Sequence, residues 1–112
     1  MKSIKVLSKK NSLSGEPVTL TEYAFSDKEL LQLLSKKMQL GFSSFKIKVE
    51  GEEKEKRKYW DFTNNLKQLI GIYGLNGAMQ AIDTMIKEHG IETIEELNDS
   101  ILDDLYYTID ML

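Results

Sequence analysis

The chain has 112 residues, 41% of them hydrophobic and 29% charged, which is long enough for one domain with a real core and too apolar for a disordered chain. Its lack of cysteine excludes disulfide bonds and thiolate metal sites, and no apolar run approaches the roughly 18 residues that cross a membrane. The net charge of −3 conceals an asymmetry, because residues 1–58 carry 13 basic and 8 acidic side chains whereas residues 59–112 carry 2 and 10.

Strands are predicted mainly in the first half of the chain. Apolar and polar residues alternate over 3–10, and residues 18–25 are rich in β-branched and aromatic side chains. The turn-forming residues between these segments predict a paired hairpin. The same alternation predicts a half-buried strand over 45–51. Residues 57–62 fit both a strand and the first turn of a helix, and we interpret them as a fourth strand.

One helix in this half has clear boundaries. Ser26 and Glu29 have the spacing of a capping box, in which each side chain accepts a hydrogen bond from the main chain of the other. Leucines at helical spacing follow, and Gly41 can adopt the left-handed conformation that ends a helix. A helix is therefore expected to begin near Asp27 and to end before Gly41.

The second half predicts only helices. The first is expected to run from Asp61 or Thr63 to Tyr73 and to end at Gly74, and a second continues from 77 to 89. Thr93 and Glu96 predict a short capped turn, and a last helix starts at Asp99 or Ser100. Strands followed by helices indicate an α+β fold with a small antiparallel sheet of 3–4 strands, and we treat 1–112 as one domain. Within it, 1–60 is the basic, sheet-rich half and 61–112 is the acidic, helical half.

No group of residues in the sequence has the pattern of a catalytic site, so we do not expect an enzyme, a cofactor or a metal ion. His89 is the only histidine, and its place near a helix end suits a structural imidazole. Glu88 and Glu92 are the nearest additional ligands for a metal, but a helix-end role for His89 fits better.

The last 25 residues are strongly acidic, with eight carboxylates and no lysine or arginine. Ordinary exposed helices mix both charges, because oppositely charged pairs one turn apart stabilise them. A face with one sign of charge therefore suggests binding to a basic surface, and bordering tyrosines are typical interface anchors. The expected partner-binding residues are Glu92, Glu95, Glu96, Asp99, Asp103, Asp110, Tyr106 and Tyr107.

A second interpretation is direct binding of nucleic acid by the basic segment 46–58. Cations next to aromatic rings suit a single strand, because the phosphates contact the charges and the bases stack on the rings. The expected contacts are Lys54, Lys56, Arg57, Lys58 and Trp60. Glu50, Glu52, Glu53 and Glu55, within this segment, weaken its positive field, so we rank this interpretation second. An exposed Trp60 would nevertheless indicate a contact surface.

The preferred interpretation is a non-enzymatic protein-binding module in the cytoplasm. In length, acidity and absence of cysteine, the chain is similar to small inhibitors of the anti-CRISPR and anti-restriction types, which phages and mobile elements encode. That similarity implies a nucleic-acid mimic that blocks a basic surface, and it rests on composition and not on a motif. The segregated charges also allow a homodimer or a self-assembling structural protein, in which the basic half of one copy meets the acidic half of another. No membrane association is expected.

Overall fold

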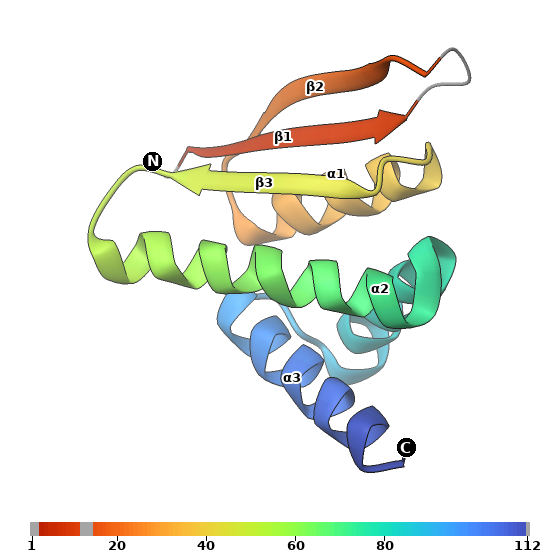
Figure 1. Cartoon of the computed structure of the whole chain (residues 1–112). Coiled ribbons are helices and arrows are strands. Elements are labelled where there is room, and N and C mark those ends of the chain that lie inside the picture. Colours follow the sequence, from red (N-terminus) through yellow and green to blue (C-terminus); the bar gives the residue numbers. More distant parts are fainter. Residues whose placement is uncertain (1–2, 12–14, 112) are drawn as a thin grey trace.

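The computed structural model describes residues 3–11 and 15–111, and the side chains of 108–111 are outside this description. Three antiparallel strands form one sheet in the order β2-β1-β3 (Figure 1). They are β1 (Ile4–Asn11), β2 (Pro17–Ala24) and β3 (Ser44–Val49). The α+β class is confirmed, and the sheet has the smaller of the two expected sizes.

The alternation of β1 and β3 gives the sheet two different faces. Ile4 lies opposite Val49, and Val6 lies opposite Ile47; all four are buried. Lys5 lies between the two pairs and points to the other face, because successive side chains of a strand alternate. The inner face therefore contributes to the core, whereas the outer face carries lysines.

Helix α1 (Asp27–Gln39) begins as the capping box predicts. The amide of Glu29 donates to Ser26 Oγ at 3.1 Å, and the carboxylate of Glu29 accepts from the amide of Phe25 at 2.7 Å. Leu30, Leu34 and Met38 then pack into the core. The return bond goes to the amide of Phe25, one residue before the cap, and not to the amide of Ser26 as in the standard capping box.

The predicted strand over 57–62 is wrong, because these residues belong to helix α2 (Glu53–His89). In a strand, Trp60 and Phe62 would share a face, and Tyr59 would occupy the other. Instead Tyr59 and Phe62 are fully buried while Trp60 is exposed, which is the pattern of a helix with 3.6 residues per turn. Packing of Tyr59 against distant parts of the chain decides between the two patterns.

Gly74 divides α2 into two helical arms. Its φ of 78° and ψ of 173° are non-helical, and this region of the backbone map is essentially restricted to glycine. The helix end predicted at Gly74 is thus confirmed as a sharp kink. Gly90, at φ 64°, ends the second arm in the left-handed conformation.

Helix α3 (Ile94–Met111) begins earlier than Asp99 or Ser100, so the predicted break before these residues is wrong. The amide of Glu96 donates to Thr93 Oγ1 at 3.2 Å, as in the predicted capping box. That cap opens the long helix directly, because Ile94, Leu97 and Ile101 continue one buried stripe without interruption.

The core is one cluster of buried residues that joins the sheet and all three helices. Helix α1 lies behind the sheet, α2 runs alongside β3, and α3 lies on the side of α2 that is away from the sheet (Figure 1). Two surfaces result, namely the outer face of the sheet with the adjoining side of α2, and the outward side of α3. Among the helices of the described residues, none is long and apolar enough to cross a membrane.

Candidate interaction surfaces

Helix α3 carries its carboxylates on its outward side. Asp99 and Asp103 are one turn apart and both exposed, while Ile101 and Leu105 on the opposite side are buried. Tyr106 lies one turn beyond Asp103 and is 65% exposed. Carboxylates and an aromatic ring therefore share one side of the helix, as the sequence predicts.

Exposed apolar groups border these carboxylates. Tyr107 is 67% exposed, and Leu102 is also exposed on the flank towards α2. Large side chains left in solvent beside charges are typical of interface anchors, since a partner can bury them on binding.

Glu95 differs from the other predicted contacts whose side chains are described, because it forms an ion pair. Its Oε1 lies 3.1 Å from Lys58 Nζ, and Lys58 is also 3.7 Å from Glu55. Burial by itself would lower the pKa of Lys58, but the hydrogen bond to Glu95 and the nearby carboxylates raise it above its ordinary value. Lys58 therefore stays charged, and it neutralises one end of the acidic helix.

The remaining predicted contacts define what we call the acidic face. Glu96 accepts a hydrogen bond from the amide of Glu92 at 3.4 Å, which orders the start of α3. Within the described part of the chain, none of the four carboxylates of this face is in an ion pair. The side chain of Asp110, a further predicted contact, lies outside the described residues. The acidic face consists of Glu92, Glu96, Asp99, Asp103, Tyr106 and Tyr107.

A partly buried hydrogen-bond network fixes α3 relative to the other helices. Tyr59 donates its hydroxyl proton to Asp27 Oδ1 at 2.5 Å, and the amide of Ile94 donates to Asp27 Oδ2 at 3.1 Å. Burial, followed by the hydrogen bond to Asp27 and its charge, raises the pKa of Tyr59 far above its ordinary value. One carboxylate at the start of α1 thus holds α2 and the first turn of α3, which positions the acidic face.

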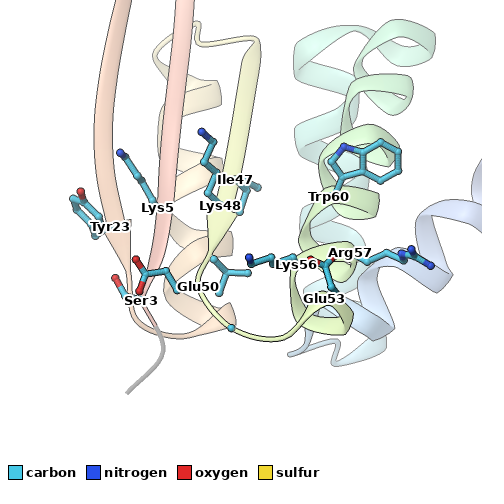
Figure 2. A pocket seen from close by; sticks show the side chains of 12 residues that line it. Ser3, Lys5, Tyr23, Ile47, Lys48, Glu50, Glu53, Lys56, Arg57 and Trp60 are labelled. Carbon is cyan, nitrogen blue, oxygen red and sulfur yellow. The ribbon is translucent and has the colours of Figure 1, made fainter.

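The second surface is a groove between β3 and α2, which we call the Trp60 groove. It comprises two adjoining hollows of about 950 Å³ and about 540 Å³, which share Ile47, Lys48 and Trp60 in their walls. Trp60 is 65% exposed, and an exposed tryptophan at this position is the feature that we expected of a contact surface. Figure 2 shows Trp60 on the α2 side of the groove and Lys48 on the strand side.

The predicted nucleic-acid contacts do not form one patch. Lys56 extends from α2 towards the strands, while Arg57 extends to the opposite side (Figure 2). Lys54 and Lys58 line a separate cleft between α2 and α3, and Arg57 borders both this cleft and the larger hollow of the Trp60 groove. The reason is helical geometry, because a turn of 100° per residue separates consecutive cations that a hairpin tip could have presented together.

Three residues of the groove were missed by the sequence reasoning, namely Lys67 on α2 and the two sheet residues Lys5 and Tyr23. Lys5 and Tyr23 line it from the sheet, and they are paired directly across β1 and β2. Strand alternation places Lys5 on the lysine-bearing face, but only the pairing of β1 with both neighbours brings it beside Lys48. The proximity of Lys5 to Lys48 therefore depends on the register of the sheet and cannot be read from the composition of either strand.

The described residues hold no group of three or more histidine, cysteine or acidic side chains arranged to bind a metal ion. His89 is exposed at the end of α2. Comparison with protein-family models, with curated proteins and with solved structures gives no match. Function must therefore be inferred from the two surfaces themselves.

Proposed function

We propose that the protein is a non-enzymatic binding module that attaches through the acidic face to a basic surface of another protein. The observation that carries this proposal is the outward side of α3, where Asp99 and Asp103 lie beside two tyrosines that are about two-thirds exposed. Like charges on one face repel each other, and a basic partner would relieve that repulsion. Glu95 is a minor contributor, because Lys58 already neutralises it.

Binding would proceed in two physical stages. Long-range attraction between the acidic face and a basic cleft speeds the encounter, and this effect weakens as salt screens the charges. Tyr106 and Tyr107 then lose solvent contact against the partner and slow its release. The charges would set the association rate, while the two rings would contribute most to the lifetime of the complex.

In its sharper form, the proposal is an inhibitor that mimics nucleic acid. A row of carboxylates on a rigid helix can occupy a groove that otherwise holds phosphates, because both present negative charge to lysines and arginines. This is the mode of action that we propose by analogy with the anti-CRISPR and anti-restriction types of inhibitor. Because its targets would act on nucleic acid, we propose that the protein works in the cytoplasm, or in the host cytoplasm if a phage encodes it.

The test is affinity capture from an extract of the native host, using the tagged protein as bait. The test variant combines Asp99→Asn with Asp103→Asn. The matched control combines Glu50→Gln with Glu53→Gln, which makes the same change in net charge at two exposed carboxylates beside the other surface. We expect wild type and control to retain a nucleic-acid-binding protein that excess DNA or RNA displaces, and the test variant to lose it.

Two results would contradict the proposal. One is equal capture of the same partner by the Asp99→Asn, Asp103→Asn variant. The other is a partner whose binding is unaffected when the ionic strength is raised, since charge attraction must then be unimportant.

A further inference from the structure

The Trp60 groove holds an unusual concentration of positive charge for a protein of net charge −3. Its two hollows are lined by six cations, against the two carboxylates of Glu50 and Glu53. In the described structure none of these six cations is in an ion pair. They are Lys5, Lys46, Lys48, Lys56, Arg57 and Lys67.

Two of these cations repel each other directly. Lys5 and Lys48 are partners in the register of β1 and β3, and both point to the outer face of the sheet. Like charges placed opposite each other destabilise an antiparallel pair. An anion bound between them would remove that repulsion, so the free groove is preorganised for negative charge.

The groove also presents aromatic rings to solvent. Trp60 lies where the two hollows meet, and Tyr23 borders the larger one at 56% exposure. Figure 2 shows Lys5, Lys48 and Lys56 around the space that separates Tyr23 from Trp60. An exposed indole between cations can serve as a stacking platform, since every nucleobase offers a flat face to it.

We infer that the Trp60 groove binds single-stranded nucleic acid, with phosphates on its cations and a base stacked on Trp60. This inference concerns a different surface from the acidic face and does not depend on it. The exposed indole of Trp60 between the cations offers a stacking surface to a nucleobase, whereas the carboxylates of an acidic peptide bring no flat ring to it. An acidic peptide is therefore the less suitable occupant. A duplex is excluded from the stacking role because its bases are already stacked inside it.

Lysines near a sheet edge have another known role, which is to prevent pairing with other chains. That role can account for Lys46 and Lys48 on β3. It does not account for Lys56 and Lys67, which are on α2, or for an exposed tryptophan between them. The nucleic-acid site explains all of these positions together.

Trp60 is the only tryptophan, so its fluorescence reports directly on the groove. The probe is a short oligothymidylate, added to the full-length protein at low ionic strength. We expect saturable quenching of Trp60 fluorescence, and an affinity that falls with salt. The logarithmic slope would approach about −3.5 if the five lysines contact phosphates of a single strand, since the side chain of Arg57 extends away from the strands (Figure 2).

Matched variants separate the groove from general charge. Lys46→Gln with Lys48→Gln should weaken binding by about tenfold or more, because two phosphate contacts are lost. Lys28→Gln with Lys36→Gln makes the same charge change at exposed positions on α1 and should have little effect. Far-ultraviolet circular dichroism establishes that each variant is folded.

The Trp60→Ala variant loses the intrinsic reporter, so its binding is followed by anisotropy of a labelled oligothymidylate. Loss of stacking should weaken that binding by about tenfold or more. The Glu50→Gln, Glu53→Gln variant should instead bind more tightly, because it removes the two opposing charges. Asp99→Asn with Asp103→Asn should leave this binding nearly unchanged, so the failure of either proposal leaves the other intact.

Four results would overturn the inference. They are the absence of fluorescence quenching, equal weakening by the α1 control variant, equal affinity for a duplex of the same length, and equally tight binding of polyglutamate. The last result would identify the groove as a site for acidic peptides.

Discussion

Lys58 and Glu95 are 37 residues apart in the sequence, and their side chains join the basic half of the protein to its acidic helix through a contact of 3.1 Å. The contact is asymmetric, because the Lys58 side chain is 14% exposed and that of Glu95 is 68% exposed. The largely buried ammonium group of Lys58 is thus paired with the exposed carboxylate of Glu95. This pair sets the end of the acidic face, since Asp99 and Asp103, which follow Glu95 on α3, form no ion pair within the described part of the chain.

The strength of this pair can be measured with a double-mutant cycle of Lys58→Met and Glu95→Gln. We expect a coupling free energy of about 0.5–1 kcal/mol, because the exposure of Glu95 allows water to screen the attraction. The measurement is urea unfolding of the four proteins. A coupling energy near zero would show that α3 is held by its buried contacts alone.

The partly buried network around Asp27 predicts a larger effect. Tyr59→Phe removes the hydrogen bond to Asp27 while it keeps the ring, and we expect a loss of stability of about 1.5–3 kcal/mol because the acceptor is charged. Urea unfolding at pH 7 measures this loss. An unchanged midpoint would mean that the bond contributes nothing beyond ring packing.

Alkaline pH should destabilise the protein through the same two residues. The folded-state pKa values of Lys58 and Tyr59 are raised from ordinary values of 10.5 and 10.0. A group whose pKa is raised in the folded state stabilises the fold at pH values below its unfolded-state pKa. This stabilisation is lost as the pH rises through the folded-state pKa. We therefore expect the unfolding free energy to fall above about pH 10, and the fall to be smaller in a Lys58→Met, Tyr59→Phe variant.

The kink at Gly74 can be tested against Gly71, which lies one turn earlier in the same helix. Gly74→Ala should destabilise the protein by about 1–3 kcal/mol, because its positive φ strains any residue with a Cβ atom. Gly71→Ala should stabilise it by about 0.5–1 kcal/mol, since its backbone is helical and an added Cβ meets no other atom within 4 Å. Similar effects of both substitutions on the melting temperature would contradict the kinked geometry.

The field around Trp60 can be measured without any ligand. An exposed indole among cations attracts anions and repels cations, so the ratio of iodide quenching to caesium quenching should be higher in the folded protein than in the protein unfolded by urea. This ratio should be lower in the folded Lys46→Gln, Lys48→Gln variant than in folded wild type. An equal ratio in the folded and the unfolded protein would show that the groove has no net positive field.

Local pattern was sufficient to predict much of the fold. Strands β1 and β3 follow from alternation, β2 from its β-branched and aromatic residues, α1 from its capping box, and the kink from Gly74. Residues 57–62 could not be assigned correctly, because both periods fit and the choice depends on the burial of Tyr59 against Asp27, which is 32 residues away. Short-range patterns contain no information about such a contact.

The candidate surfaces were predictable to different degrees. The outward carboxylates of α3 follow from helical periodicity, so Asp99 and Asp103 could be paired from the sequence. The ion pair of Glu95 could not, because it depends on how α2 packs against α3. The Trp60 groove could be predicted only in part, since Lys5 reaches it through the register of the sheet.

The most direct test of the proposed function is the rate constant for association with the captured partner, measured at about 50 and about 200 mM salt. If the acidic face steers binding, this constant should fall by about tenfold over that range. It should fall much less for the Asp99→Asn, Asp103→Asn variant, while the Glu50→Gln, Glu53→Gln control behaves like wild type. A rate constant that is insensitive to salt, or equal in wild type and the Asp99→Asn, Asp103→Asn variant, would contradict binding through the acidic face.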